Sequence, residues 1–295
     1  MTFSIEVKQK IDELKREYES LKKGKESLLD IIFEAELPES VTNSNAIEGS
    51  TLSIAETEKI LMELEVSREV SVREVFEAKN LARVFEYLKN KIDSKNIDKE
   101  LMLFIHKMLL TNIRDGIAGR FRVLNEYVRV GTHIAPAPEH IEVMLDALIL
   151  EYSSIHNLHF LEKIGRFHLE FEYIHPFNDG NGRIGRVLMN YQLMQLGFPP
   201  IIIRDKEKDV YYESFREYRN SQKNKITTMN KVVSLALMES LHKRIAYLKS
   251  QIIIHLSEYS KKIGEKSSVL LNKAKRQTIP AFREKGVWKI GIDKN

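Results

Sequence analysis

Apolar residues recur every three or four positions along most of this chain, which is the spacing of amphipathic helices. The first thirty-odd residues follow this spacing at Ile11, Leu14, Tyr18 and Leu21, and Gly24 is placed to interrupt the helix. The same periodicity returns in most later segments, so the hydrophobic pattern predicts a largely helical protein.

Capping residues mark where several of these helices begin. Ser53 with Glu56, and Ser71 with Glu74, have the spacing of a capping box, in which a hydroxyl and a carboxylate three residues apart satisfy free N–H groups. Before the first box lies AELPESVTNSNAIEGSTLS, residues 35–53, which contains Pro38 and is rich in capping residues. This composition predicts a break with room for one short helix.

Further helices are expected over DKELMLFIHKMLL, IEVMLDALILEYSS, FLEKIGRFHLEFEYI and RIGRVLMNYQLMQLG, with two or more others up to about Tyr259. The segment RFRVLNEYVRVGTHIAPAPEH differs, because β-prone residues surround a Gly-Thr turn. It predicts a short β-hairpin, or flap. The expected fold class is therefore all-α with a β-hairpin flap.

Composition restricts the fold class and the cellular compartment expected for the protein. The 295 residues are 43% hydrophobic, enough for a sizeable core, and the 13 glycines and 7 prolines are few, which favours helices over a turn-rich β fold. There is no cysteine, which excludes disulfides and thiolate metal sites. The charged N-terminus lacks a signal core, and no apolar run approaches the ~18 residues of a membrane span. We expect a cytoplasmic protein without membrane contact.

Charge is unevenly distributed. The chain carries +4 overall, yet the stretch from Lys261 to Asn295 alone holds ten Lys/Arg and three Asp/Glu. The remainder is therefore slightly acidic, which argues against a general nucleic-acid binder and leaves nucleic-acid contact to the C-terminal segment.

The segment IHPFNDGNGRIGR, residues 174–186, concentrates candidate chemistry between two expected helices. Gly180 and Gly182 are expected to turn the backbone with positive φ and to approach a ligand closely, and the N-terminus of the following helix is a natural anion site. Arg183 and Arg186 share one face of that helix and suit phosphate oxygens, while Asp179 could hold Mg²⁺ against them. His175 could take a proton from a hydroxyl. Together these residues indicate phosphoryl or nucleotidyl transfer.

Each part also has an ordinary structural interpretation. A lone G-N-G is usually a turn, Arg-x-x-Arg is usually a solvated helix face, and histidine before proline often caps a helix. The combination is more specific, because the segment matches H-x-F-x-[D/E]-G-N-G-R-x-x-R, the signature of the Fic family, at every fixed position.

The chain resembles Fic-domain proteins from roughly Leu37 to Asn220, including AGRFR, RVGTHIAPAPEHI and YYESF outside the signature. The resemblance implies a helical fold with a flap and an enzyme that uses Mg-ATP to place AMP on a Ser, Thr or Tyr hydroxyl of a target protein, which can include itself. It also implies His175 as general base, Asp179 as the Mg²⁺ ligand and Phe177 as an anchor of the loop. The implied nucleotide-binding residues are Val130, Gly131, Thr132, His133, Asp179, Gly180, Asn181, Gly182, Arg183, Ile184, Gly185, Arg186 and Tyr211.

A second resemblance lies in SNAIEG, from Ser44 to Gly49, which is similar to the [S/T]-x-x-x-E-[G/N] inhibitory motif of Fic proteins with an N-terminal inhibitory helix. It implies that Glu48 pairs with Arg186 and takes the cation that the γ phosphate needs. In some relatives the same carboxylate supports AMP removal. The local alternative is a capped turn, with Asn45 as N-cap and Gly49 as its end.

The C-terminal sequence predicts a separate unit. KAKRQTIPAF is interpreted as a turn and a basic helix and REKGVWKI as a hairpin, and together they resemble the winged-helix module of several Fic proteins. It would contact DNA, or alternatively serve docking or homodimerisation. The expected divisions are 1–95, a helical region with the inhibitory helix near 44–49; 96–225, the Fic core with its catalytic loop at 175–186; 226–259, C-terminal helices; and 260–295, the winged-helix-like module.

Two functions of different class remain at this point. The first is an autoinhibited protein adenylyltransferase using ATP and Mg²⁺. The second is a DNA-binding regulator whose Fic body senses nucleotide. Transfer of UMP or phosphate is a variant of the first.

Overall fold

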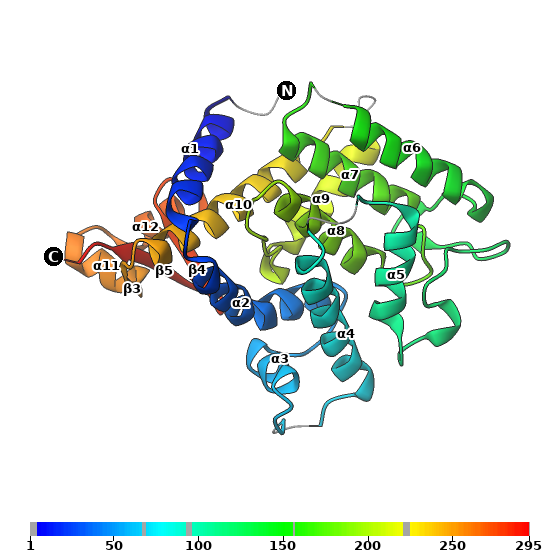
Figure 1. The fold of residues 1–295 in the computed structure, drawn as a ribbon, viewed down its shortest axis with the longest axis horizontal. Helices are drawn as coiled ribbons and strands as arrows, with labels where there is room; N and C mark the ends of the chain where they lie inside the picture. Colours follow the sequence, from blue (N-terminus) through cyan, green and yellow to red (C-terminus); the bar gives the residue numbers. More distant parts are fainter. Residues whose placement is uncertain (1–4, 67–68, 93–95, 156, 221–224, 295) are drawn as a thin grey trace.

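The computed structural model describes residues 5–66, 69–92, 96–155, 157–220 and 225–294. The described part of the chain is mostly helical, as the hydrophobic pattern predicts, and its short strands lie in the flap and near the C-terminus (Figure 1). The helices of the body are α1 (Ile5–Lys22), α2 (Glu26–Ile47), α3 (Ile54–Leu61), α4 (Val72–Lys89), α5 (Lys99–Leu110), α6 (Ile141–Ser154), α7 (Phe160–Ile174), α8 (Asn181–Gln195), α9 (Lys208–Asn220) and α10 (Thr227–Leu248).

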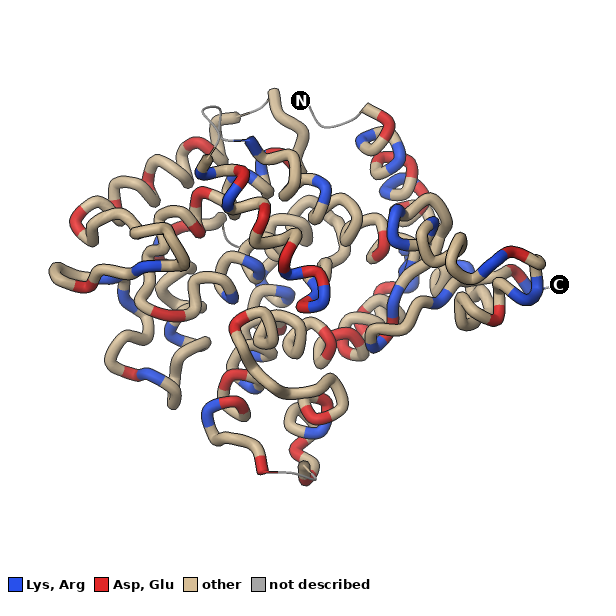
Figure 2. The backbone as a smooth tube through the Cα atoms, turned by 180° about the vertical axis from the view of Figure 1, so that it is seen from behind, with Lys and Arg blue, Asp and Glu red and all other residues tan. Residues whose placement is uncertain are grey.

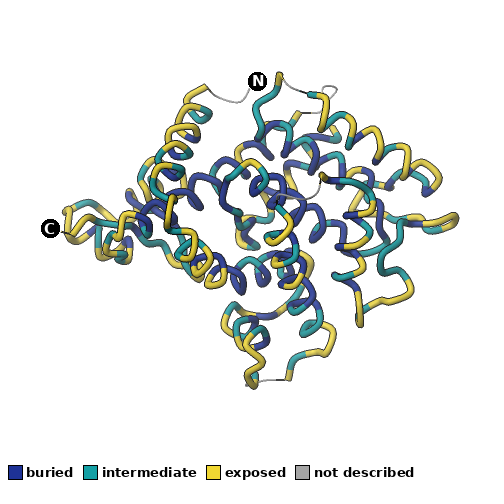
Figure 3. Tube along the Cα trace, viewed as in Figure 1, coloured by how far each residue is buried: buried dark blue, intermediate teal, exposed yellow. Residues whose placement is uncertain are grey.

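Two hydrophobic clusters hold this body together, and α7 and α8 contribute to both. One gathers α4, α5 and α6 around Phe171, Phe177 and Leu188. The other joins α1, α9 and α10 around Leu193 and Leu237. Figure 3 shows the central helices dark blue and the outer faces yellow. Nearly every residue of α8 is buried, so the helix that follows the candidate loop is fixed from all sides.

Helix α2 is longer than the sequence predicts. The expected break over residues 35–53 is wrong, because α2 continues through Pro38 to Ile47. Thr42 donates its hydroxyl to the Pro38 carbonyl at 2.7 Å, and the Asn43 amide donates to the Glu39 carbonyl at 2.8 Å. Capping-type side chains thus bond back into the helix, and burial of this segment outweighs its poor helix propensity.

Short local signals were more reliable. Ser53 and Glu56 form a complete capping box, and Ser71 accepts from the Glu74 amide. The flap is a small hairpin in which β1 (Arg129–Val130) pairs with β2 (His133–Ile134) across Gly131, whose φ is +60°. The prediction of a hairpin here is confirmed.

The C-terminal module, Ile252–Ile292, has its own small core around Leu270 and Ile290. It consists of β3 (Ile252–His255), α11 (Leu256–Ile263), α12 (Ser267–Lys275), β4 (Ala281–Glu284) and β5 (Val287–Ile292). The sheet order is β3-β5-β4, so the unit begins before the boundary predicted at residue 260. The hairpin at REKGVWKI is confirmed. The helix expected within KAKRQTIPAF is wrong, since α12 ends at Lys275 and β4 follows.

Positive and negative residues are interspersed where the C-terminal module meets the body (Figure 2). The excess charge of this segment is therefore partly matched by carboxylates of the body. Among the described residues, no helix is long and apolar enough to cross a membrane.

Candidate active site

The candidate loop joins the end of α7 to the start of α8, and two backbone positions allow its turn. His175 is left-handed, with φ +50°, and Gly180 caps α8 with φ +83°. Asn181 closes the loop, because its side chain accepts from the Phe177 amide at 2.9 Å and donates to the Phe177 carbonyl at 2.8 Å. Phe177 is fully buried. The Asn181 side chain is therefore engaged in shaping the loop, and only its backbone is left for an anion.

Arg122 fixes the loop from the side of the flap. Its guanidinium donates to the carbonyls of His175 at 2.8 Å, Glu126 at 2.9 Å and Pro136 at 2.9 Å, and only 2% of the residue is exposed. The residue lies in AGRFR, but no feature of the sequence indicates its role. Several carbonyls held by one buried cation form a rigid support for the catalytic loop.

His106 supports the loop from α5. Its ring stacks on Phe177 with centroids 3.8 Å apart, accepts from the Gly119 amide at Nδ1, and faces the Asp179 carbonyl from Nε2 at 3.1 Å. Burial lowers the pKa of His106 to about 4. A neutral ring with its proton on Nε2 satisfies both contacts, so this histidine shapes the loop and was not identified from the sequence.

Burial determines the charge state of His175. Burial lowers its pKa to about 4, and the positive charge of Arg122 acts in the same direction. The imidazole is therefore neutral at pH 7. Beside it, 3.8 Å from Nδ1, lies a carboxylate oxygen of Glu172. Burial, followed by the nearby Glu48 charge, raises the pKa of Glu172 to about 8. The Glu172 carboxyl is therefore protonated at neutral pH.

Asp179 and Arg183 form a second group of charged residues at the start of α8. Asp179 accepts from Arg183 at 3.2 Å and from Arg114 at 3.3 Å, with Arg73 at 3.5 Å. Arg183 is buried and also pairs with Glu77 at 3.3 Å. Arg183 does not line the cleft that holds His175 and Arg186. The two arginines therefore have different partners, although the sequence predicted that both bind phosphate.

The donor set at Asp179 fits Mg²⁺ held mainly by a nucleotide. Among the described residues, no group of three or more His, Cys, Asp or Glu could hold a metal ion. Mg²⁺ commonly takes one or two carboxylates and completes its octahedron with phosphates and waters. Asp179, with part of its side chain exposed, suits that arrangement.

Arg186 is held by the end of α2. Its guanidinium donates to the Ser44 hydroxyl at 3.0 Å, to the Ser44 carbonyl at 2.8 Å and to a Glu48 carboxylate oxygen at 2.8 Å. Burial alone would lower the pKa of Arg186, but Tyr211 and Glu48 raise it above its ordinary value. Glu48 and Ser44 therefore lie at Arg186, and the ion pair expected from SNAIEG is present. Ser44 and Glu48 lie at the C-terminal end of the long helix α2, and not in the capped turn that was the alternative interpretation of SNAIEG.

Gly182 makes room for this contact. Its φ is not positive, contrary to expectation, but a Cβ there would lie 2.2 Å from the Glu48 carboxylate and 3.0 Å from Arg186. The Glu48 carboxylate therefore rests against the first turn of α8, where free N–H groups and the helix dipole favour an anion. It occupies the region that the sequence assigned to phosphates.

A cleft of about 480 Å³ joins these groups, within the range of small-molecule sites. Of the predicted residues it is lined by Val130, Gly131, Thr132, His133, His175, Gly182, Arg186, Tyr211 and Glu48. Gly180, Asn181, Ile184 and Gly185 lie behind it in the loop and in α8. His133 fixes the flap, because its Nε2 lies 2.9 Å from the Tyr173 carbonyl.

Tyr211 is almost fully buried, and its hydroxyl lies 2.7 Å from His168 Nε2. It forms the floor of the cleft. Its neighbour Tyr212 was not identified from the sequence; it donates to the Ile47 carbonyl at 2.9 Å and holds the end of α2. A larger cleft, about 820 Å³, lies between α10 and the C-terminal module, away from these groups.

Comparison with known proteins agrees with this geometry. Residues 96–193 match the model of the Fic/DOC family. This segment of the chain, which includes the candidate loop, therefore resembles a Fic/DOC family domain. The "Protein adenylyltransferase Fic" of Nematostella vectensis is 35% identical over 214 residues, which are 70% of this chain and 49% of that protein. The protein of the same name from Drosophila willistoni is 33% identical over 58% of this chain and 35% of its own length. The chain thus spans between about a third and a half of these relatives.

Solved structures extend the likeness. A Fic-domain-containing signaling protein from Bacteroides thetaiotaomicron superposes with a TM-score of 0.72 at 25% identity, covering 81% of this chain and 97% of that one. A Fic family protein from Desulfovibrio desulfuricans covers 100% of this chain and 98% of its own, with a TM-score of 0.65 at 17% identity. The second likeness, which concerns the fold alone, includes the C-terminal module.

Proposed function

We propose that this protein is an adenylyltransferase that moves AMP from Mg-ATP to a Ser, Thr or Tyr hydroxyl of a protein, and that Glu48 restrains it. The observation that carries the proposal is a neutral, buried His175 in the same cleft as Arg186 and the N-terminus of α8. Relatives named protein adenylyltransferase support the choice of ATP and of a protein acceptor.

His175 acts as the general base. It accepts the proton of the target hydroxyl while that oxygen attacks the α phosphorus. The bond from the α phosphorus to its bridging oxygen breaks, and pyrophosphate leaves. A positioned base of this kind is worth roughly 10²–10⁴ in rate. Arg122 and Asn181 keep the loop in shape, and the flap at Gly131 and Thr132 aligns the acceptor segment.

Phosphate binding rests on Arg186 and the first turn of α8. Guanidinium forks and free helix N–H groups stabilise the charge that builds on the departing pyrophosphate. Mg²⁺, held by Asp179 and the phosphates, would neutralise part of this charge. Arg183, which pairs with Asp179 and Glu77, positions Asp179.

Glu48 restrains the reaction because it occupies both phosphate-binding features. It pairs with Arg186 at 2.8 Å and lies against Gly182. While this pair persists, the γ phosphate lacks its cation and ATP binds unproductively. We include AMP removal as a second reaction of the site, because the Glu48 carboxylate lines the cleft beside His175 and can align a water.

The test is direct labelling of protein. Glu48→Gly protein is incubated with labelled ATP, CTP, GTP or UTP and Mg²⁺, and modified protein is found by mass spectrometry. We expect a mass increase of one AMP in the ATP sample, on the protein itself or on an added target. Transfer of another nucleotide or of phosphate alone would redirect the assignment within the family, and absence of any label would remove it.

A further inference from the structure

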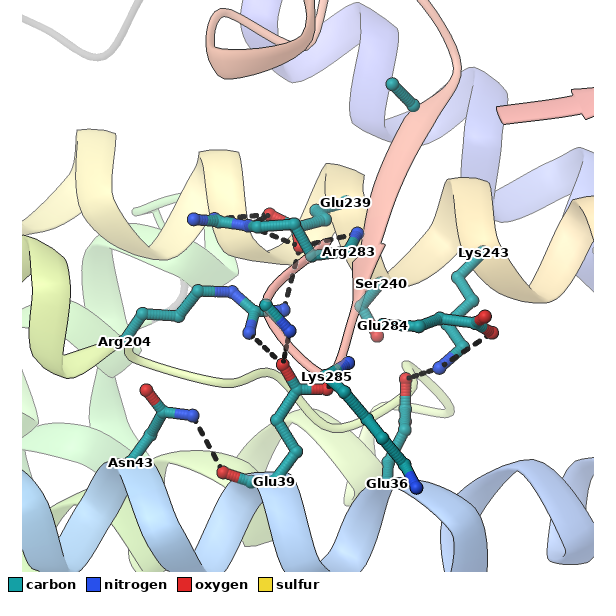
Figure 4. A network of polar contacts seen from close by, with 12 residues as sticks. Glu36, Glu39, Asn43, Arg204, Glu239, Ser240, Lys243, Arg283, Glu284 and Lys285 are labelled. Carbon is teal, nitrogen blue, oxygen red and sulfur yellow. Dashed lines mark hydrogen bonds and ion pairs between the residues drawn. The ribbon is translucent and has the colours of Figure 1, made fainter. Parts of the chain in front are cut away.

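The C-terminal module contacts the helix that carries Glu48. Helix α2 runs from its junction with the module to the candidate active site, and Glu39 lies nine residues before Glu48, about 13 Å along a helix that rises 1.5 Å per residue. Figure 4 shows the junction, with α2 below, α10 above and the β4–β5 hairpin between them.

The tip of the hairpin binds Glu39. Lys285 and Gly286 form a two-residue turn, both with positive φ, as the twist of tight hairpins requires. Both turn amides donate to the Glu39 carboxylate, Lys285 at 3.0 Å and Gly286 at 2.9 Å. Arg204 pairs with the same carboxylate, and the Glu39 side chain is 3% exposed. The hairpin tip therefore recognises a carboxylate of α2.

Strand β4 of the hairpin is anchored by a second buried carboxylate. Glu239 of α10 accepts from the Arg283 guanidinium at 2.6 Å and from the Arg204 guanidinium at 2.9 Å. Burial alone would raise the pKa of Glu239, but the two arginines lower it below its ordinary value. Arg204 thus bridges Glu39 and Glu239, so that α2, α10 and β4 share one network of charges.

A third contact binds α2 to α10 one turn earlier. Glu36 pairs with Arg244 and, at 3.1 Å, with Lys243, which also lies 3.4 Å from Glu284 of β4. All these carboxylates are largely buried, and an unpaired buried charge is costly. Undocking of the hairpin would therefore leave Glu39 and Glu239 without part of their buried partners.

The Lys and Arg side chains of the hairpin form ion pairs with carboxylates of this same chain. Arg283 pairs with Glu239 and Glu207, Lys285 with Glu58, and Lys289 with Glu284. Nucleic-acid contact through the hairpin would require these pairs to break. Its surface fits an acidic helix face, and α2 provides one.

We propose that the β4–β5 hairpin is a docking surface for α2, and that docking keeps Glu48 on Arg186. When the module leaves α2, the C-terminal turn of α2 loosens and Glu48 releases Arg186. The consequence for AMP transfer rests on the proposed function above, whereas the docking itself does not.

The experiment compares Glu39→Gln and Arg283→Gln with Glu58→Gln as the matched control, because Glu58 pairs with Lys285 but lies on α3. The first readout is hydrogen exchange of residues 40–48, with α7 as the internal reference for global unfolding. We expect exchange to rise in both test variants and to stay at the wild-type rate in the control. Unchanged exchange in both test variants would overturn the proposal, as would an equal rise in α7.

The second readout is AMP labelling. Glu39→Gln should raise it about three- to tenfold, since loss of one charged hydrogen bond shifts an equilibrium by on the order of tenfold. It should add nothing in a Glu48→Gly background, where no restraint is left. Additive gains would overturn the coupling between the two ends of α2. If exchange rises as expected but Glu48→Gly protein takes no label, the docking stands and the proposed function fails.

Discussion

Helix α2 forms ion pairs near its middle and at its C-terminal end, and the two differ mainly in their exposure to water. The Glu39 side chain is 3% exposed, whereas the Glu48 side chain is 38% exposed and opens on the cleft. A buried pair leaves an uncompensated charge when it breaks, while a partly exposed one can exchange its partner for water or phosphate. The middle of α2 is therefore suited to be a fixed anchor and its end to be a switch.

The largest effect should come from removing the base that the switch controls. In a Glu48→Gly background, His175→Ala should reduce AMP transfer by roughly 10²–10⁴, because no other described residue of the loop that lines the cleft can accept a proton. ATP affinity, measured by calorimetry, should change little, since phosphates are bound by other residues. Robust labelling by the double variant would remove the proposed mechanism.

The anchor and the switch should differ sharply in their contribution to stability. Glu39→Ala should lower the free energy of unfolding by about 3–5 kcal/mol, because Arg204 and two amides lose a buried partner. Glu48→Gly should lower it by less, because the Glu48 side chain is partly exposed and Arg186 keeps its hydrogen bonds to Ser44. Denaturant melts of the two variants check this, and equal losses would contradict the distinction between anchor and switch.

The dependence on Mg²⁺ should be assigned to Asp179. In the Glu48→Gly background, Asp179→Asn should raise the Mg²⁺ concentration needed for half-maximal labelling by about tenfold, the effect expected when a charged contact is lost. Asp205→Asn, a surface change outside the loop, serves as the control. A superimposable Mg²⁺ titration for the Asp179 variant would assign the metal to other groups.

A smaller effect concerns pH and Glu172. Its pKa is raised from 4.5 to about 8, so the folded state holds a proton that the unfolded state releases, and stability falls as pH rises through this interval. The buried histidines act below pH 6.5, because their pKa values are lowered, and they lose stability as pH falls. Between pH 6.5 and 8 the Glu172 contribution is therefore separate from that of these histidines. It lowers the free energy of unfolding by about 2 kcal/mol over this window. Glu172→Gln should flatten the decline in melting temperature over this window, and an unchanged decline would refute the assignment.

Much of the fold and the loop could be predicted because their signals are local. Helical periodicity, the Ser53 box, the Gly131 hairpin and the 174–186 loop each depend on residues close in the sequence. The length of α2 could not be predicted, because Pro38 and the capping residues after it oppose a helix locally, and only tertiary burial reverses that preference.

The residues that hold the site in place could not be predicted from the sequence either. Arg122 holds carbonyls more than fifty positions away, and Glu39 meets Lys285 across 246 residues. Nothing in the spacing of either residue indicates such a partner. Glu172 looks like an ordinary exposed helix residue until α8 packs over it at Gly185.

The central claim is that Glu48 blocks a competent site, and AMP labelling of Glu48→Gly against wild type tests it most directly. Removing the carboxylate should raise labelling about tenfold to a hundredfold, since one charged contact is worth on the order of 1.5–3 kcal/mol. Glu48→Gly with Arg186→Ala should lose the gain, because the freed cation is then absent. Labelling of Glu48→Gly equal to or below that of wild type, with folding confirmed by melting temperature, would contradict the account.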